Sequence, residues 1–251
     1  MNREATDLAG VRHIAYETLG STNAEALARA RAGERGPLWI TAATQSAGRG
    51  RRGNAWVSTP GNLFATLLLT EPSPPDVAPQ LSFVAGLGLH DAVAECAPQL
   101  GPLLKLKWPN DLLLAGAKLA GILIEGESGP PFAVALGIGV NCAVHPAGTP
   151  YPATDLAAHG ALVTPSRLLE SLARAMNRRL GQWQAGQGFA GVRADWIKRA
   201  AGMGQDIRVR LPERELAGRF QGLDEMGRLL LQAENGVTTV TAGEVFDLGI
   251  H

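Results

Sequence analysis

The chain has 251 residues, of which 45% are hydrophobic and 18% charged, which is the composition of an ordinary globular protein. Lysines plus arginines and aspartates plus glutamates both number 23, so the formal net charge is zero. This balance argues against a protein that holds nucleic acid by bulk positive charge, although a local basic site remains compatible with it. The N-terminal segment MNREATDLAG lacks the apolar run of a signal peptide, and no stretch reaches the roughly 18 apolar residues of a membrane span. We therefore expect a cytoplasmic protein.

The first part of the chain predicts two helices and two strands. STNAEALARARAG (21–33) predicts a short helix in which Thr22 and Glu25 form a capping box and Gly33 marks the end. The runs PLWITAAT and GNLFATLLLT are apolar and rich in β-forming residues, so we predict two strands that flank a loop. A longer helix is predicted from about Val77 to Cys96, because apolar residues recur there at helical spacing. Its buried side is predicted to hold Leu81, Val84, Leu87 or Gly88, and Ala92.

The rest of the chain predicts a sheet, two helices and an all-β tail. Three successive strands are predicted in 103–114, 118–126 and 132–142, with AGA as a tight turn between the first two. Helical spacing returns in 165–184 and 188–200. QDIRVRL, LAGRFQGL, GRLLLQ and VTTVTAGEV then predict the short strands of a small barrel. The predicted class is α+β: a main domain of residues 1–202, with a mixed β-sheet flanked by helices, and a small β-barrel domain of residues 203–251.

The segment TQSAGRGRRGNAW (44–56) combines three arginines and three glycines with no acidic residue. Glycines allow the backbone to fold close around a ligand. The guanidinium groups of Arg49, Arg51 and Arg52 suit a carboxylate or a phosphate. From these residues alone, two other interpretations stay open: a solvated surface loop, and an arginine–glycine patch that contacts RNA.

The segment KWPND (107–111) and Lys118 form a second candidate group. Trp-Pro interrupts the predicted strand, so Asn110 and Asp111 lie directly after the break, at the end of the strand. Their oxygens could hold Mg²⁺, or the two residues could simply make a turn. The AGA turn brings Lys118 back beside Leu113 and close to Asp111, where an ammonium group could meet negative charge that builds during a reaction. The other interpretation of Lys118 is a strand-edge lysine that hinders aggregation.

Ser21, Thr22 and Asn23 stand at the start of the first predicted helix. Their hydroxyl and amide groups could recognise a small polar head group, with Gln45 acting from the opposite side, or they could only cap the helix. The two roles are compatible, so local structure does not separate them.

The order of these motifs resembles that of the biotin protein ligases. STN is followed by Q-x-x-G-R-G-R-R-G, K-W-P-N-D, K-L-A-G-I-L-I-E and G-I-G-V-N, and the resemblance extends from about Leu19 to Leu248. It implies the family's fold, which has a mixed sheet like that of class II aminoacyl-tRNA synthetases and a C-terminal SH3-like barrel. It also implies a biotin–[biotin carboxyl-carrier protein] ligase that uses ATP and Mg²⁺ to convert biotin into biotinyl-5′-AMP. The biotin would then pass to a lysine of the biotin carboxyl carrier protein of acetyl-CoA carboxylase or a related carboxylase.

The resemblance further implies a ligase-only form. Some relatives repress transcription through an N-terminal DNA-binding domain, but only 20 residues precede Ser21 here. We therefore expect no DNA binding, and a monomer or weak homodimer. GNAW follows the arginines where some relatives carry further basic residues, which leaves adenylate affinity open.

The same resemblance implies roles for individual residues. Lys118, Arg51 and Asp111 are the expected catalytic residues; Lys118 is expected to contact both the biotin carboxylate and the α-phosphate, and Asp111 to ligate Mg²⁺. The implied biotin-binding residues are Ser21, Thr22, Asn23, Gln45, Arg49, Gly50, Arg51, Lys118, Gly121 and Leu123. The implied ATP- and adenylate-binding residues are Arg51, Arg52, Trp56, Asn110, Lys118 and Asn141.

Two rival functions remain to be compared with this one. A lipoate or octanoate ligase shares the catalytic fold and the adenylate chemistry but lacks the GRGRRG loop. A nucleic-acid-binding module would use only the arginine loop, residues 44–56. The zero net charge and the presence of only one glycine–arginine cluster argue against that function.

Overall fold

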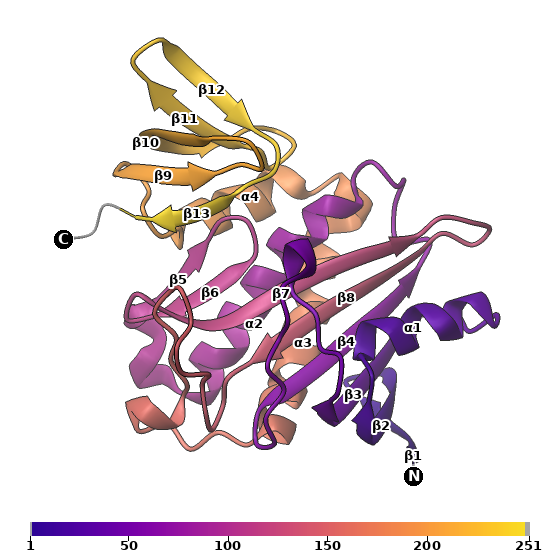
Figure 1. The fold of residues 1–251 in the computed structure, drawn as a ribbon. Coiled ribbons are helices and arrows are strands. Elements are labelled where there is room, and N and C mark those ends of the chain that lie inside the picture. Colours follow the sequence, from indigo (N-terminus) through magenta and orange to yellow (C-terminus); the bar gives the residue numbers. More distant parts are fainter. Residues whose placement is uncertain (1, 249–251) are drawn as a thin grey trace.

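An eight-stranded mixed β-sheet forms the centre of the larger unit (Figure 1). The structure, a computed structural model, describes residues 2–248. Across the sheet the strand order is β1-β2-β3-β4-β8-β7-β6-β5, and only the β2–β3 pair within the described residues is parallel. The strands are β1 (Asn2–Leu8), β2 (Val11–Leu19), β3 (Leu38–Gln45), β4 (Leu63–Thr70), β5 (Leu104–Lys107), β6 (Asp111–Leu114), β7 (Ala117–Glu127) and β8 (Ala133–Val140).

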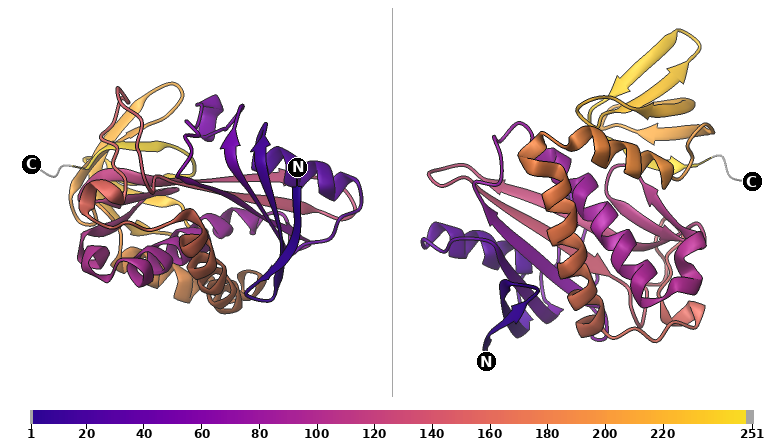
Figure 2. Two further views of the ribbon diagram at one scale, coloured as in Figure 1. Left: turned by 90° about the horizontal axis from the view of Figure 1, so that it is seen from below. Right: turned by 180° about the vertical axis from the view of Figure 1, so that it is seen from behind.

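Helices cover both faces of this sheet (Figure 2). On one face, α1 (Thr22–Arg31) packs its Ala26, Leu27 and Ala30 against Ile40 and Leu68. On the other face lie α2 (Leu81–Cys96) and α3 (Pro165–Trp183), with α4 (Phe189–Lys198) beside them. The 3₁₀ turns are η1 (Arg51–Gly53), η2 (Ala78–Gln80), η3 (Pro98–Leu103), η4 (Ala157–His159) and η5 (Gln184–Gly186). No helix between residues 2 and 248 is long and apolar enough to cross a membrane.

The predicted capping box at the start of α1 is wrong. Ser21 is the N-cap residue, and its Oγ accepts a hydrogen bond from Ala24 N at 3.4 Å. Glu25 instead accepts from the Tyr16 hydroxyl at 2.7 Å and pairs with Arg29 one turn later. The capping role therefore moves one residue toward the N-terminus, and Thr22 is left to point toward Gln45.

The predicted strand 103–114 is a hairpin of two strands, β5 and β6, which reverse at a cis Trp108–Pro109 bond. The predicted turn after it is confirmed: Leu113 pairs with Lys118 across the β6–β7 hairpin. The hairpin β1–β2 was not predicted. The turn at residues 108–110 sends Asp111 back along the sheet, so Asp111 pairs with Lys107 on one side and with Gly121 on the other.

The C-terminal unit is a five-stranded antiparallel sheet of order β12-β11-β10-β9-β13. Its last predicted strand, VTTVTAGEV, is divided in two. Trp108 Nε1 donates to Gly227 O at 3.1 Å, and a Cβ atom at Gly227 would lie 2.6 Å from the Phe83 ring, so this turn is pressed against α2. The sheet therefore sits over the β5–β6 end of the larger unit (Figure 1). Its strands are β9 (Asp206–Arg210), β10 (Glu215–Leu223), β11 (Leu229–Ala233), β12 (Gly236–Val240) and β13 (Glu244–Asp247).

Candidate active site

A cavity of about 100 Å³ lies on the α1 side of the sheet, over β7 and β8. Its lining brings together nearly all the residues singled out from the sequence. Asn141 is the exception, since it does not line the cavity. The lining includes Ser21, Thr22, Asn23, Gln45, Arg49, Gly50, Arg51, Arg52, Trp56, Asn110, Asp111, Lys118, Gly121 and Leu123.

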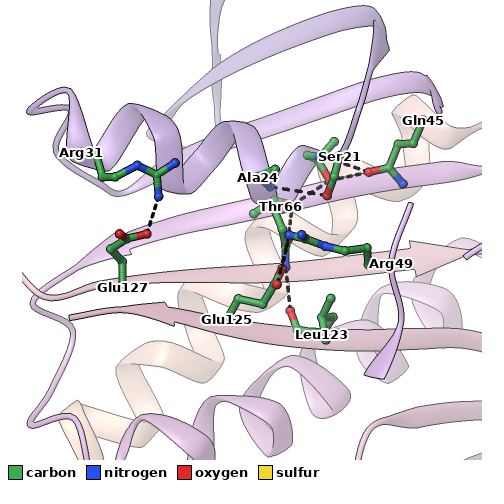
Figure 3. A network of polar contacts seen from close by, with 11 residues as sticks. Ser21, Ala24, Arg31, Gln45, Arg49, Thr66, Leu123, Glu125 and Glu127 are labelled. Carbon is green, nitrogen blue, oxygen red and sulfur yellow. Dashed lines mark hydrogen bonds and ion pairs between the residues drawn. The ribbon is translucent and has the colours of Figure 1, made fainter. Parts of the chain in front are cut away.

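One end of the cavity is lined by the uncharged polar side chains of Ser21, Thr22, Asn23 and Gln45. Figure 3 shows Ser21 and Gln45 among the contacts around them. Gln45 Oε1 accepts from the Thr22 backbone N at 2.8 Å and from the Thr22 hydroxyl at 3.1 Å. Gln45 Nε2 donates to Ser58 Oγ at 3.1 Å. These bonds fix which end of the Gln45 amide faces α1, so this amide is oriented before any ligand arrives.

Asn23 is fixed in the same way at the first turn of α1. Its Nδ2 donates to Leu123 O at 3.2 Å and to Glu125 Oε2 at 2.8 Å (Figure 3). Its Oδ1 accepts from the Thr66 hydroxyl at 2.7 Å. A Cβ atom at Gly137 would lie 2.4 Å from this Oδ1, so only glycine leaves room for the amide. Asn23 is buried at 3% exposure, and its role as a helix-start residue and its place in the cavity coexist.

Two further glycines form the floor of the cavity, and the Trp56 indole lies on them. A Cβ atom at Gly139 would be 2.5 Å from Trp56 Cε2, and one at Gly121 would be 3.0 Å from Trp56 Cζ3. The indole therefore takes up space that a ligand would use. The remaining volume of about 100 Å³ is well below the roughly 300–1,000 Å³ of typical small-molecule sites. A ligand that lies on Gly121 and Gly139 therefore requires the Trp56 indole to move.

The other end of the cavity is a buried cluster of charges around Asp111. Asp111 Oδ2 lies 3.0 Å from Lys107 Nζ, and Asp111 Oδ1 lies 2.8 Å from Lys118 Nζ. Burial by itself would raise the pKa of Asp111, but the two ammonium groups lower it below its ordinary value. Burial likewise opposes the charge of Lys118, yet Asp111 raises the pKa of this lysine. The cluster thus holds two ammonium groups against one carboxylate and presents net positive charge to the cavity.

Lys107 and Tyr151 are cavity residues that the sequence analysis missed. Lys107 Nζ also donates to Val245 O in β13, at 3.1 Å. The Tyr151 ring centroid lies 5.0 Å from Lys118 Nζ, within the range of a cation–π contact. Lys107 is the first residue of the KWPND motif, so this motif was the signal in the sequence that could have identified it as a cavity residue. Tyr151 lies in a loop without any periodic pattern, and no local motif marks it as a cavity residue.

Asn141 supports the loop that carries Tyr151. Its Nδ2 donates to Thr154 O at 3.0 Å, and Thr154 N donates to Lys118 O at 3.0 Å. In this structure Asn141 is therefore linked to the cavity through the main chain of Thr154 and Lys118. Direct contact between Asn141 and a nucleotide stays a prediction.

The arginine loop lies closed over the cavity and reaches the C-terminal unit. Its own backbone forms a narrow hairpin, with Gly50 N donating to Asn54 O at 2.7 Å. Arg51 Nη1 donates to Asn110 Oδ1 at 3.4 Å and to Gly243 O at 3.3 Å. Arg52 Nη2 donates to Arg210 O at 3.3 Å. The loop therefore bridges the two units above the Asp111 cluster.

The residues around Asp111 do not fit a protein-held Mg²⁺ ion. Both carboxylate oxygens of Asp111 face ammonium groups, and Asn110 Oδ1 faces Arg51. Within residues 2–248, no group of three or more His, Cys, Asp and Glu side chains is arranged to hold a metal ion. The expected Mg²⁺ ligation by Asp111 is therefore not supported by its contacts, because the carboxylate is engaged by two lysines.

Comparisons with known proteins agree with the motif order. The model of the biotin/lipoate A/B protein ligase family matches residues 20–141, and that of the biotin protein ligase C terminal domain matches residues 202–246. The chain is 45% identical over 239 residues to the biotin–[acetyl-CoA-carboxylase] ligase of Paracoccus denitrificans, covering 90% of this chain and 96% of that protein. It is 35% identical over 234 residues to the corresponding ligase of Mycobacterium tuberculosis, covering 91% and 86%.

The fold comparison gives the same result. The solved structure of the biotin protein ligase from Aquifex aeolicus in complex with biotin and ATP matches with a TM-score of 0.77 at 26% identity, covering 93% of this chain and 97% of that one. The predicted fold class, a mixed sheet flanked by helices with a small C-terminal β unit, is confirmed. Motifs, fold and relatives agree, and the chain belongs to the biotin protein ligase family.

Proposed function

We propose that this protein is an ATP-dependent biotin–[acetyl-CoA-carboxylase] ligase, which forms biotinyl-5′-AMP and transfers biotin to a lysine of the carboxylase's biotin carboxyl carrier protein. The observation that carries the proposal is a single cavity with a neutral polar end and a buried cationic end. The ureido ring of biotin has N–H donors and a carbonyl acceptor, which suit fixed amide and hydroxyl groups such as those of Asn23, Thr22 and Gln45. The dithiolane ring of lipoate has no such groups, so the polar end favours biotin.

The cationic end suits the first chemical step. A carboxylate oxygen of biotin attacks the α-phosphorus of ATP, the bond from that phosphorus to the bridging oxygen breaks, and pyrophosphate leaves. Two anions must approach each other, so positive charge close to the reacting atoms lowers the barrier. Lys118 and Arg51 line this part of the cavity, and Asp111 keeps Lys118 protonated and in place. We expect Mg²⁺ to be held by the phosphates of ATP and to neutralise part of their charge.

The second step needs no nucleophile from the enzyme. The neutral amine of the carrier lysine attacks the carbonyl carbon of the mixed anhydride, AMP leaves with its phosphate, and the amine loses a proton as the amide forms. Between the steps the anhydride must be kept from water, for which the closed arginine loop is suited. In this proposal, Arg52, Trp56 and Asn110 contact the nucleotide once the loop rearranges.

We assign adenylation to residues 1–202 and a supporting, carrier-facing role to residues 203–251. The boundary between these ranges falls after α4 ends at Lys198 and before β9 begins at Asp206. The C-terminal family match, residues 202–246, supports the same division.

The test is exchange of labelled pyrophosphate into ATP with biotin, with lipoate and with neither acid. Exchange with biotin alone is the expected result. Exchange with lipoate alone would retain the reaction class but overturn the interpretation of the polar end, and no exchange with either acid would overturn the proposal. Transfer is then measured by avidin blotting of a purified carrier domain.

A further inference from the structure

Glu125 on β7 does not line the cavity, yet two lining residues share its carboxylate (Figure 3). Its Oε2 accepts from Asn23 Nδ2 at 2.8 Å and from Arg49 Nη2 at 3.2 Å, and its Oε1 lies 3.1 Å from the same Arg49 nitrogen. Asn23 belongs to the first turn of α1, whereas Arg49 belongs to the loop that closes the cavity. The Glu125 side chain thus connects the polar end of the cavity to the arginine loop.

Glu127, on the same strand, is an acidic residue whose ion pair does not involve the cavity, so it can be compared with Glu125. Residues two apart on a strand point to the same face, so Glu125 and Glu127 share a side of the sheet. Glu127 pairs with Arg31 at the end of α1, at 2.5 Å, away from the cavity (Figure 3). Neither Glu127 nor Arg31 lines the cavity, so this pair serves as a matched control.

Glu125 and Leu123 O together determine how the Asn23 amide is oriented. An ionised carboxylate only accepts hydrogen bonds, so it requires Nδ2 to face β7. Oδ1 is then left to face Thr66 and Gly137. Leu123 O is the only other acceptor that holds Nδ2 among the described residues, and its bond is longer, at 3.2 Å.

We propose that Glu125 is a positioning residue that couples ligand recognition by Asn23 to closure of the loop by Arg49. The ligand's identity as biotin rests on the proposed function, while the coupling itself rests on these contacts. The Arg49–Glu125 ion pair is partly exposed, with side-chain exposures of 47% and 28%. It therefore shifts the equilibrium between the open and the closed loop only a few-fold. The bond from buried Asn23 to a carboxylate is stronger. We call the Glu125–Arg49 ion pair the latch. A weak latch allows the arginine loop to open in every catalytic cycle, while the stronger bond keeps Asn23 in place.

Two substitutions separate the two contacts. Glu125→Gln keeps a side-chain carbonyl that can accept from Asn23 but removes the charge that attracts Arg49. Glu125→Leu removes both contacts.

In ligand-free protein, cleavage by trypsin after Arg51 and Arg52, followed by mass spectrometry, reports how often the loop opens. We expect Glu125→Gln to speed this cleavage about two- to fivefold and to leave the KM for biotin in pyrophosphate exchange within about twofold. We expect Glu125→Leu also to raise that KM about tenfold.

Two controls make the result specific. Glu127→Gln should change neither the cleavage rate nor the KM. Arg49→Gln combined with Glu125→Gln should open the loop no faster than either single change, because both remove the same pair. Equal cleavage rates in Glu125→Gln and the unchanged protein would overturn the latch, and an unaltered KM in Glu125→Leu would overturn the coupling. The cleavage assay needs no ligand, so it tests the latch even if the unchanged protein shows no biotin-dependent exchange, a result that would count against the proposed function instead.

Discussion

Lys107 and Lys105 share one face of β5 by the alternation of a strand, yet Lys105 is exposed and Lys107 is buried. Two acceptors account for the burial: the Asp111 carboxylate after the turn, and Val245 O in the last strand. An ammonium group is buried only where such partners exist. Local sequence contains the first partner but gives no information on the second, which comes from 138 residues further along the chain.

Replacing Lys118 with alanine tests the role of its charge. Lys118→Ala removes an ammonium group aimed at the cavity, so we expect adenylation to fall by about 10²–10³, the usual loss when one group that stabilises developing charge is removed. Biotin-dependent pyrophosphate exchange measures the effect, with exposed Lys105→Ala as the control. A turnover like that of the control would show that Lys118 has no part in the step.

Replacing Asp111 with asparagine tests the buried cluster as a structural unit. Asp111→Asn leaves two buried ammonium groups without their shared carboxylate, so we expect unfolding free energy to fall by about 3–5 kcal/mol. Because folding lowers the pKa of Asp111, its stabilisation is present above the unfolded value of 3.8 and is lost as pH falls through the lower folded value. Urea unfolding should therefore show a constant difference between the two proteins near neutral pH and a smaller one below about pH 4. A difference that grew on acidification would contradict this.

At the scale of elements, the arginine loop could be located from sequence but its resting position could not. Glycine and arginine spacing indicated a basic loop that folds close to a ligand, and the structure places these residues on the cavity. The position of Trp56 depends on Gly121 and Gly139, which face each other in the β7–β8 hairpin and lie far from Trp56 in the sequence. A linear pattern contains no information about that contact.

Trp56 should report ligand binding through its fluorescence. The other four tryptophans are at most 3% exposed, whereas Trp56 is half-buried and lies on the glycine floor of the cavity. We expect saturating biotin and ATP to shift or quench the emission, and Trp56→Phe to abolish most of that change. Trp183→Phe, in a helix away from the cavity, should preserve it. A signal that survived in Trp56→Phe would show that it comes from another tryptophan, such as Trp108, which also lines the cavity.

The helices and most sheet strands were predictable because their periodic patterns are long. The predicted buried side of α2 is confirmed, with Leu81, Val84 and Leu87 all fully buried. The β1–β2 hairpin was not predicted, and β5 and β6 were predicted as one strand, because a four-residue strand contains too little pattern to show its ends. The helix cap was misplaced by one residue because Ser21 and Thr22 are both good capping residues.

At the scale of the whole molecule, the two units share one apolar core. Phe220, Leu229 and Leu231 of the C-terminal sheet belong to the same buried cluster as Phe83 and Trp196. Phe83 makes edge contacts with Phe189 at 5.6 Å and with Trp196 at 5.4 Å between ring centroids. The sequence indicated two domains by a change of pattern, but it did not reveal that their interiors are continuous.

A continuous core predicts that the units unfold together. All five tryptophans lie before residue 200 and so belong to the larger unit. Trp108 also contacts the C-terminal sheet, through Gly227 O. Phe220→Ala removes a fully buried ring from the C-terminal unit, and we expect it to destabilise the protein by about 3–5 kcal/mol. The tryptophan-detected unfolding midpoint should move accordingly, in a single transition. If that midpoint stayed fixed, the two units would be unfolding independently.

The way in which the C-terminal sheet meets the site has a consequence for evolutionary divergence. Lys107, Arg51 and Arg52 contact this sheet at the carbonyl oxygens of Val245, Gly243 and Arg210, and Trp108 contacts it at the carbonyl of Gly227. Carbonyl oxygens are supplied by every residue type, so these contacts by themselves constrain the path of the chain and not the side chains. Gly227 and Gly243 are constrained for another reason, because a Cβ atom there would meet Phe83 and Val209. Homologues can therefore exchange residues on the outer surface of this sheet without altering the charge arrangement around Asp111.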